Sequence, residues 1–402
     1  MFIKQVTKMT VRDIEVAGKK ALVRVDLNVP LDAVAGVITD DNRIQAVLPT
    51  IKYLTDRGAK VILLSHLGRP KGKVEEKLRL AIVGQRLSQL LTQPVTVTKD
   101  CIGPEVEKAV ERLKSGEVLL LENVRFHPEE ERNDASFAQA LARLADIYVN
   151  DAFGTMHRAH ASIIGIADYL PSVAGLLAEK ELQVLGKLLT NPTHPFAALL
   201  GGAKISDKVG MLENIMDRVD CLLIGGGMAA IFLKARAYEI GLSLIEMERL
   251  DTVVGLMKKA ARNGVHLLLP VDVIVVNELS AKAKAKTVSI ENIPADLQIA
   301  DIGEQTINQF SQELSKCKTV FWNGPMGVYE IPQFAKGTKA IAKLLAGLDT
   351  TTIIGGGSTA EVVGEMGLAD KMTFVSTGGG ASLRFLGGET LPGVTVLRDK
   401  RS

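Results

Sequence analysis

The chain has 402 residues, of which 47% are hydrophobic and 23% charged, a balance that excludes a disordered or fibrous protein. At about 150 residues per domain, this length predicts two or three domains, each with a core of its own. The 48 lysines and arginines nearly cancel the 46 aspartates and glutamates, and the net charge of +2 excludes a general attraction to nucleic acid or to anionic membranes. Any affinity for anions must therefore be local.

Cysteine usage and hydropathy indicate a cytoplasmic protein. Cys101, Cys221 and Cys317 lie far apart and form no CxxC pair, so their spacing predicts neither a disulfide framework nor a zinc site. The first thirty residues lack the apolar core of a signal peptide, and no later stretch reaches 18 apolar residues without a charge. We therefore expect no membrane segment.

Short apolar runs rich in β-branched residues recur along the chain, and each is followed by a segment with helical periodicity. Near-continuous apolar runs are typical of parallel strands that are covered on both faces, so the pattern predicts an α/β fold with parallel sheets. In chain order, the ten predicted strands are Ala21–Val25, Lys60–Leu64, Val118–Leu121, Ile147–Val149, Ala197–Leu200, Cys221–Ile224, His266–Leu269, Thr319–Trp322, Thr351–Ile354 and Met372–Val375.

The composition changes near the middle of the chain, which indicates two lobes with different ligands. The glycine triplets and the pair Gly201-Gly202 all follow residue 190, whereas the arginines in candidate binding loops precede it. A charged, helix-like stretch from Leu176 to Leu189 ends at Asn191-Pro192, and proline marks such boundaries. We expect a first domain over residues 1–177, an interdomain helix over 178–190 and a second domain over 191–387. The triplets are Gly225–Gly227, Gly355–Gly357 and Gly378–Gly380.

Glycines at four predicted strand ends indicate a polyphosphate site. Glycine lets the backbone approach a phosphate, and the following helix offers free N–H groups and the positive end of its dipole. The absence of GxxxxGK[ST] excludes a P-loop NTPase. Two segments, Gly225–Ala230 and Gly355–Ala360, match a loose GxGxxA, so a nicotinamide-dependent oxidoreductase stays open; stabilisation by NAD rather than ADP would be its mark.

Lys204 and Lys208 follow a predicted strand directly. Four residues apart on an opening helix, they would share one face and reach adjacent phosphates, although a solvated basic face is an equal alternative.

The first lobe carries arginines in loops after its predicted strands. Arg24 to Pro30 ends the first strand, Ser65 to Pro70 ends the second, and Arg43, Arg125 and Arg158 lie in comparable contexts. Arginine binds phosphate and carboxylate with two parallel hydrogen bonds, so a ring of arginines with His66 and Asn28 suits a small acid with several charges. Any one of these arginines by itself could simply be solvated.

The histidines and serines do not indicate a metal centre or a catalytic triad. The chain has six histidines but no HExxH, and no GxSxG. His157 and His160 could ligate a metal, but capping or anion contact is the favoured interpretation.

Seven motifs in this order resemble those of phosphoglycerate kinases, over about residues 11 to 394. They are ALVRVDLNVP at 21–30, SHLGRP at 65–70, ENVRFH at 122–127, NDAFGTMHRAHAS at 150–162, LLGGAKISDK at 199–208, WNGPMGVYE at 322–330 and STGGGASL at 376–383.

The resemblance implies a monomeric kinase of two Rossmann-like lobes, each a parallel sheet flanked by helices, joined by a connecting helix and hinge. It would exchange a phosphoryl group between ATP and 3-phosphoglycerate, giving ADP and 1,3-bisphosphoglycerate, with Mg²⁺ bound to the nucleotide. The N-terminal lobe would hold the phosphoglycerate and the C-terminal lobe the nucleotide. Residues 388–402 would return to the N-terminal lobe.

Site residues carry over motif by motif. We expect Arg43 and Lys204 to clamp the transferring phosphoryl group, helped by N–H groups at Gly356 and Gly357. The substrate-binding residues would be Asp26, Leu27, Asn28, Arg43, His66, Leu67, Gly68, Arg69, Arg125, Arg158, Gly379 and Gly380. The nucleotide-binding residues would be Gly202, Ala203, Lys204, Lys208, Gly226, Asn323, Pro325, Val328, Glu330, Gly355, Gly356, Gly357, Ser358 and Thr359.

Two positions depart from the family pattern. Ser358 stands where the family has an aspartate that contacts the magnesium, and a neutral hydroxyl is a poorer ligand for that cation. In the segment Ile299–Glu304, the branched Ile299 is expected to narrow the pocket for the nucleotide base. Ser358 also leaves open a relative that binds both ligands without turnover.

Overall fold

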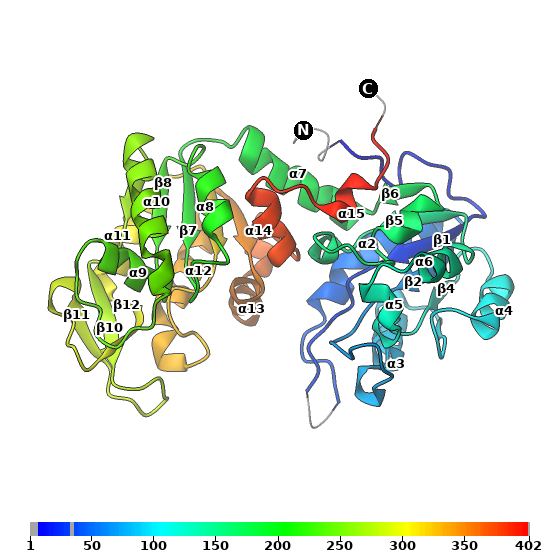
Figure 1. The fold of residues 1–402 in the computed structure, drawn as a ribbon, viewed down its shortest axis with the longest axis horizontal. Helices are drawn as coiled ribbons and strands as arrows, with labels where there is room; N and C mark the ends of the chain where they lie inside the picture. The colour runs from blue at the N-terminus through cyan, green and yellow to red at the C-terminus, as the bar shows by residue number, and fades with distance from the viewer. Residues whose placement is uncertain (1–6, 33–35, 401–402) are drawn as a thin grey trace. The chain divides into compact units, whose positions relative to one another are not determined.

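The computed structural model describes residues 7–32 and 36–400 (Figure 1). The chain forms two compact units: unit 1 comprises residues 1–183 and 390–402, and unit 2 comprises residues 184–389. The boundary falls inside helix α7 (Leu176–Thr190), where the sequence predicts a connecting helix. Among the described residues, no helix is both long and apolar enough to span a membrane.

Unit 1 contains a six-stranded parallel sheet in the order β3-β4-β2-β1-β5-β6. Its strands are β1 (Lys20–Arg24), β2 (Lys60–Leu64), β3 (Val95–Val97), β4 (Val118–Leu120), β5 (Ile147–Asn150) and β6 (Ser172–Ala174). Its helices besides α7 are α2 (Asn42–Asp56), α3 (Ala81–Leu91), α4 (Pro104–Arg112), α5 (Pro128–Glu131), α6 (Ala135–Ala142) and α15 (Pro392–Thr395).

Both faces of this sheet are covered, because successive residues of β1 enter different cores. Val23 packs in a cluster with residues of α2 and α3, such as Ile51 and Leu87. Leu22 packs in a second cluster with residues of α4 and α6, such as Val110 and Leu141. A strand that is buried on both sides needs an unbroken apolar run, which is the signal in the sequence.

Unit 2 repeats this architecture with the strand order β15-β14-β13-β7-β8-β9, again parallel. The strands are β7 (Phe196–Leu200), β8 (Cys221–Ile224), β9 (His266–Leu268), β13 (Thr319–Asn323), β14 (Thr351–Gly355) and β15 (Phe374–Val375). The helices are α8 (Val209–Ile215), α9 (Met228–Ala235), α10 (Leu250–Arg262), α11 (Glu304–Leu314), α12 (Lys336–Gly347), α13 (Gly357–Glu365) and α14 (Gly380–Leu386).

A second, antiparallel sheet in unit 2 is not predicted by the sequence pattern. It has the order β11-β10-β12 and comprises β10 (Asp272–Val276), β11 (Lys286–Ser289) and β12 (Gln298–Ile302). Its small core contains Val276, Ala300 and Phe334. The ten predicted strands are all present, so the α/β prediction with parallel sheets is confirmed and this sheet is an addition to it.

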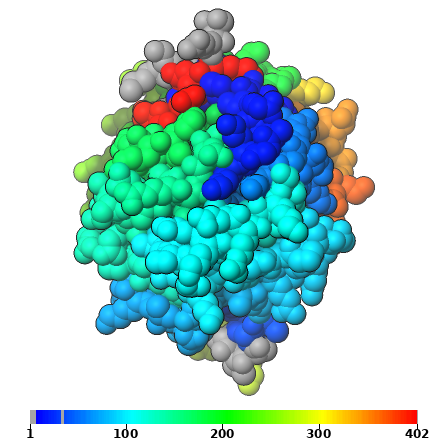
Figure 2. All heavy atoms as spheres, turned by 90° about the vertical axis from the view of Figure 1, so that its right-hand side faces the viewer, coloured from blue at the N-terminus to red at the C-terminus, as the bar shows by residue number. Residues whose placement is uncertain are grey.

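The C-terminal segment belongs to unit 1. The amide of Met9 donates to the carbonyl of Arg398 at 2.8 Å, and the amide of Arg398 donates to the carbonyl of Ser172 at 2.9 Å. The buried Lys8 donates to Asp399 Oδ1 at 2.7 Å and to the carbonyl of Leu397 at 3.0 Å. Figure 2 shows the segment in red beside the dark-blue N-terminal residues.

Each parallel sheet has a point at which the strand order reverses. In unit 1 the chain passes from β1 to β2 and later adds β5 on the other side of β1. In unit 2 it passes from β7 to β8 and later adds β13 on the other side of β7. Ligands of open α/β sheets bind beyond the carboxyl ends of the strands at such points, which directs attention to the loops after β1 and β7.

Candidate active site

The loop after β1 is joined to α2 by an ion pair. Arg43 Nη1 lies 2.7 Å from Asp26 Oδ2, and the amide of Asn28 donates to Asp26 Oδ1 at 3.2 Å. The Asp26 side chain is 12% exposed and the Arg43 side chain 39% exposed, so the guanidinium is partly open to solvent. Asp26 therefore orients the Arg43 guanidinium and leaves some of its N–H groups able to bind a ligand.

The loops after β1, β2 and β4 are joined to one another through Gly68. Its amide donates to Asn28 Oδ1 at 2.8 Å, and its carbonyl accepts from Arg125 Nη1 at 2.8 Å. The backbone of Leu27 donates to Ser65 Oγ at 3.0 Å, and the carbonyl of Leu67 accepts from Asn123 at 2.7 Å. The predicted residues of these loops are thus brought together in unit 1.

Arg24 contacts residues of this region with a buried side chain. The sequence analysis did not include it among the site residues. Its guanidinium is buried, with Nε 2.9 Å from Ser162 Oγ and Nη2 3.2 Å from His66 Nδ1. Ser162 in turn donates to the buried carboxylate of Glu130 at 2.5 Å. Arg24 is the last residue of β1. The one signal for its place in the site is a charged residue within an otherwise apolar, buried run.

Positive charge is in excess around His66. Burial, together with Arg24, Arg125, Arg158 and Arg43, holds the pKa of His66 well below its usual value. Burial and the charges of Arg158 and Arg24 lower the pKa of Arg125 to about 10. A cationic group that is disfavoured by other cations gains stability when an anion binds beside it. We call Arg24, Arg43, Arg69, Arg125, Arg158 and His66 the arginine cluster.

Arg158 and Arg69 lie at the more open side of the arginine cluster. Arg158 is half-buried, and burial and the neighbouring charge of Arg69 lower its pKa, while Asp26 raises it. Arg69 is exposed. The cluster therefore runs from a buried arginine to a solvent-exposed one, as an anion site that is open to solvent requires.

In unit 2, the four glycine turns lie at strand ends, as predicted. Gly201-Gly202 follows β7, Gly225–Gly227 follows β8, Gly355 ends β14 before Gly356 and Gly357, and Gly378–Gly380 follows β15. Because all four strands are parallel, the turns lie along one edge of the sheet. Helices α9, α13 and α14 begin within or directly after three of these turns.

Backbone hydrogen bonds join two of these turns to the loop after β13. The amide of Gly202 donates to the carbonyl of Pro325 at 2.9 Å, and that of Gly226 donates to the carbonyl of Met326 at 3.0 Å. Gly324 has φ +99°, and a Cβ there would lie 2.3 Å from the carbonyl oxygen of Gly201. Glycine at this position is required by both conformation and space.

The start of α13 is open. Apart from chain neighbours and the backbone of the helix itself, no described residue has an atom within 4 Å of a Cβ built at Gly357. The same holds at Gly379 and at Gly380, the first residue of α14. Thr359 Oγ1 accepts from the amide of Gly324 at 2.7 Å and so holds the first turn of α13 against the loop after β13. The first N–H groups of α13 therefore lie beside free space, which suits an anion.

Asn323 offers a donor at the same place. Its side chain is buried, and Nδ2 finds no hydrogen-bond partner within the described part of the chain. A Cβ built at Gly356 would lie 3.0 Å from that nitrogen. A buried donor without a partner is costly unless a ligand or water accepts from it.

The prediction that Lys204 and Lys208 share a helix face is wrong. Gly202 has φ +86°, residues 201–208 form turns, and α8 begins only at Val209. Lys208 is buried, its pKa is lowered by burial, and a Cβ at Gly202 would lie 3.4 Å from its Nζ. Lys204 and the neighbouring Ala203 are exposed. Lys208 thus lies buried beside the turn at Gly202, whereas Lys204 is exposed to solvent.

The remaining predicted nucleotide residues lie between β13 and α13. Val328 donates from its amide to the carbonyl of Ala300 at 2.8 Å, and Glu330 is exposed. Between them, the Tyr329 hydroxyl donates to Glu361 Oε2 at 2.8 Å and also hydrogen-bonds Ser358. Ser358 at the start of α13 is therefore held beside a carboxylate one turn further along the helix.

The segment Ile299–Glu304 contains a strand and a buried carboxyl group that the sequence analysis did not predict. Ile299 lies in β12, and its amide donates to Ser243 Oγ at 3.0 Å. Asp301 is buried and accepts from the amides of Gly337 at 2.8 Å and Ile302 at 2.9 Å. Burial raises the pKa of Asp301 to about 7. This carboxyl group packs the antiparallel sheet against α12.

Comparisons with known proteins agree with this geometry. The family model described as phosphoglycerate kinase matches residues 11–389. Curated relatives named phosphoglycerate kinase include one from Moorella thermoacetica, 53% identical over 98% of this chain and 100% of its own, and one from Dictyoglomus turgidum, 54% identical over 98% and 99%. Solved phosphoglycerate kinases from Coxiella burnetii and Pyrococcus horikoshii are 41% and 33% identical with TM-scores of 0.84 and 0.83, each covering 97% of this chain and 98% of its own. The chain belongs to the phosphoglycerate kinase family.

Proposed function

We propose that this chain transfers a phosphoryl group between ATP and the carboxylate of 3-phosphoglycerate, with unit 1 holding the phosphoglycerate and unit 2 the nucleotide. The observation that carries the proposal is the gathering of partly buried cations in the arginine cluster, where burial, and after it the neighbouring cations, lower the pKa values of His66 and Arg125. A ligand with a phosphate and a carboxylate would offset that positive charge.

In unit 1, the loops that meet at Gly68 provide both charge and orientation. Arginine side chains would bind the phosphate of 3-phosphoglycerate in pairs of hydrogen bonds, while Asn28 and His66 would contact neutral oxygens. The substrate set comprises Asp26, Leu27, Asn28, Arg43, His66, Leu67, Gly68, Arg69, Arg125 and Arg158, to which the proposal adds the open turn at Gly379 and Gly380.

In unit 2, the glycine turns would bind the nucleotide mainly through backbone N–H groups. Lys208 lies buried beside the turn at Gly202 and would add positive charge there, and Asn323 Nδ2 would supply the donor that lacks a partner in the described part of the chain. Glu330, which is exposed, would accept from a ribose hydroxyl. The nucleotide set comprises Gly202, Ala203, Lys204, Lys208, Gly226, Asn323, Pro325, Val328, Glu330, Gly355, Gly356, Gly357, Ser358 and Thr359.

The reaction needs no general base. The acceptor carboxylate is already ionised at neutral pH, unlike a hydroxyl acceptor. His66, whose pKa is held well below its usual value, stays neutral at that pH and acts as a hydrogen-bonding group. Catalysis then consists of positioning and of stabilising charge on the transferring phosphoryl group by Arg43, Lys204 and the N–H groups at Gly356 and Gly357.

The residues at the start of α13 fit a magnesium ion that arrives with the nucleotide. Mg²⁺ in such sites keeps several waters and is held by substrate phosphates with one or two protein oxygens, and a serine hydroxyl can be one of them. Ser358 would provide that hydroxyl, with Glu361 one turn further along. The bound ion supplies charge neutralisation on the phosphates.

Transfer requires the two units to approach each other, because the proposal places one substrate on each. Closure would also exclude water, which could hydrolyse the acyl phosphate. Small-angle scattering should show compaction when both substrates are bound. Unchanged scattering with saturating ligands would count against this part of the proposal.

We extend the proposal to a cytoplasmic monomer. The three cysteines are free thiols and are buried, as is common in reducing compartments. Size-exclusion chromatography with light scattering would report the mass directly, and a stable dimer would contradict this extension.

The direct test is the formation of 1,3-bisphosphoglycerate from ATP and 3-phosphoglycerate, coupled to NADH oxidation by glyceraldehyde-3-phosphate dehydrogenase. We expect turnover that Arg125→Ala abolishes and that Arg143→Ala, an exposed arginine on unit 1, leaves unchanged. Binding of ADP without turnover would favour a relative that has lost its chemistry, and stabilisation by NAD instead of ADP would favour an oxidoreductase.

A further inference from the structure

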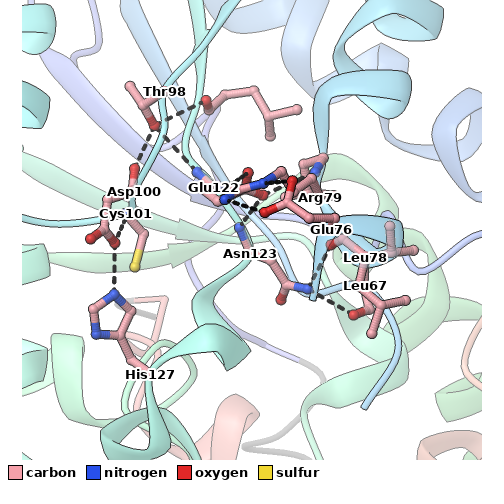
Figure 3. A network of polar contacts seen from close by, with 12 residues as sticks. Leu67, Glu76, Leu78, Arg79, Thr98, Asp100, Cys101, Glu122, Asn123 and His127 are labelled. Atoms are coloured by element: carbon pink, nitrogen blue, oxygen red, sulfur yellow. Dashed lines mark hydrogen bonds and ion pairs between the residues drawn. The ribbon is translucent and has the colours of Figure 1, made fainter. Parts of the chain in front are cut away.

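Three side chains of different chemistry meet on unit 1, outside the arginine cluster. Asp100 and Cys101 follow β3, and His127 follows the short 3₁₀ turn Val124–Phe126 after β4. Figure 3 shows the Cys101 thiol and the Asp100 carboxylate both beside the imidazole of His127. Within the described ranges, this is the group of three or more such residues whose ligand atoms could hold a metal ion.

The spacing of the ligand atoms is close to that of a tetrahedral site. One carboxylate oxygen, the sulfur and one imidazole nitrogen all lie within 4.8 Å of one another, and His127 Nε2 is 2.6 Å from Asp100 Oδ1. Zinc bonds of about 2.0–2.3 Å place the ligand atoms of a tetrahedron roughly 3.3–3.8 Å apart. An adjustment of about 1 Å would therefore close the site.

The backbone around the three side chains is already held in place. Thr98 Oγ1 donates to the carbonyl of Asp100 at 2.6 Å, and the amide of Cys101 donates to Asp100 Oδ1 at 2.6 Å. The His127 ring lies against Phe137, with centroids 5.1 Å apart. Second contacts of this kind orient metal ligands and raise affinity.

Exposure decides how a cation would enter. Cys101 is fully buried, whereas the side chains of Asp100 and His127 are 53% and 25% exposed. A cation would arrive from the side of Asp100 and His127 and would place its fourth ligand, a water, toward solvent.

We propose that Asp100, Cys101 and His127 bind one Zn²⁺ ion, at a site that is separate from the magnesium of the nucleotide. A thiolate, an imidazole and a carboxylate together select zinc, whereas magnesium takes oxygen ligands. Binding forms a zinc–sulfur bond and breaks the S–H bond, and the proton passes to solvent. The hydrogen bond between His127 and Asp100 is exchanged for two bonds to the ion.

Such an ion would connect two loops of unit 1, one that contributes to the arginine cluster and one that does not. The segment with Asp100 and Cys101 carries no residue of the arginine cluster, but the loop with His127 also carries Asn123 and Arg125. A bound ion would therefore restrict the loop that positions Arg125 and would stabilise unit 1 against unfolding.

The test uses the full chain after treatment with a chelator and needs no substrate. Titration with Zn²⁺ in a calorimeter should give one ion per chain, and Co²⁺ should give a thiolate-to-metal charge-transfer band in the near ultraviolet. Cys101→Ser should abolish the band, and both Cys101→Ser and His127→Gln should weaken zinc binding by more than about 100-fold.

Cys317→Ser is the matched control, because it removes another buried thiol that lies in unit 2. It should leave the stoichiometry and the band unchanged. Asp100→Asn, at a half-exposed side chain, tests the site without disturbing the core if Cys101→Ser does not fold. Failure of the wild-type chain to bind zinc, or binding that survives all three ligand substitutions, would overturn the proposal.

Discussion

Units 1 and 2 share one architecture but differ in the groups that line the carboxyl ends of their strands. In unit 1 the loops after the strands carry several neighbouring arginine side chains. Each of these charges can be removed by a single substitution. In unit 2 the corresponding turns are glycines whose backbone amides bond to neighbouring turns. Under the proposed function, the same sheet edge would therefore bind anions by side-chain charge in unit 1 and by backbone N–H groups in unit 2.

This difference predicts how each unit fails. Loss of an arginine should remove binding or rate and leave the fold intact, whereas a methyl group at a glycine turn should disturb the fold itself.

Arg43→Ala should reduce kcat by about 10³-fold, or about 4 kcal/mol, because it removes a cation from the transferring phosphoryl group. Arg86→Ala is a close control: both arginines have side chains 39% exposed, and each is paired with an aspartate at 2.7 Å. Both variants should melt within a degree or two of each other. The coupled assay with a melting curve checks this, and a similar loss of rate in both variants would contradict the role of Arg43.

Gly324→Ala should destabilise unit 2 by about 3–4 kcal/mol, because its Cβ would strike the carbonyl of Gly201 at a positive φ. Gly357→Ala adds the same methyl group where nothing described lies within 4 Å, so it should keep stability and weaken ADP binding. Fluorescence of Trp322, the only tryptophan of the chain and part of the unit 2 core, follows the unfolding in urea. Equal stability of the two variants would show that the turn is less constrained than its geometry indicates.

Asp151 gives unit 1 a pH dependence. Burial raises the pKa of this carboxyl to about 6, and within the described residues its Oδ2 has no hydrogen-bond partner. The folded state then binds more protons than the unfolded state between about pH 4 and 6, so stability falls as pH rises through that window. The loss is at most about 3 kcal/mol.

Asp151→Asn should reduce this fall by the contribution of Asp151, since an amide keeps the shape and cannot ionise. Asp301 in unit 2, whose pKa burial raises to about 7, keeps its own contribution in both proteins. Urea unfolding at pH 5 and pH 7.5, followed by far-ultraviolet circular dichroism, compares the two proteins. The same change with pH in both would exclude Asp151 as its source.

Ser358→Asp should lower the magnesium concentration for half-maximal rate by about fivefold, because a carboxylate binds Mg²⁺ better than a hydroxyl does. Ser358→Ala should shift the titration in the other direction. Superimposable magnesium titrations for all three proteins would show that the start of α13 does not contact the ion.

The sequence predicts the parallel sheets well because their strands are buried on both faces. All ten predicted runs are strands, whereas β3, β6, β10, β11 and β12 were missed. Of these, β3 and β11 are partly exposed, and short runs such as Val95–Val97 carry little pattern. The glycine turns could be predicted from their place after apolar runs. The antiparallel sheet was not predicted: β11 is mostly exposed and resembles a loop, whereas β10 is a largely buried apolar run that the pattern could have indicated.

The sequence predicted which residues belong to the candidate site but not which residues contact one another within it. Motifs indicate Arg43, Arg125 and Arg158, yet nothing in the sequence pairs Arg24 with Glu130 through Ser162, a contact that spans 138 residues. The different surroundings of Lys204 and Lys208 were also not predicted, because α8 begins only at Val209 and both lysines precede it. Long-range packing decides such details.

The return of the C-terminal segment affects how the chain is made. Lys8 and Met9 are held by residues 397–399, which a ribosome adds only after the whole of unit 2. Unit 2 can close its core while synthesis continues, but unit 1 must wait with Lys8 unpaired. The N-terminal half is thus synthesised first and completed last, after the whole of unit 2.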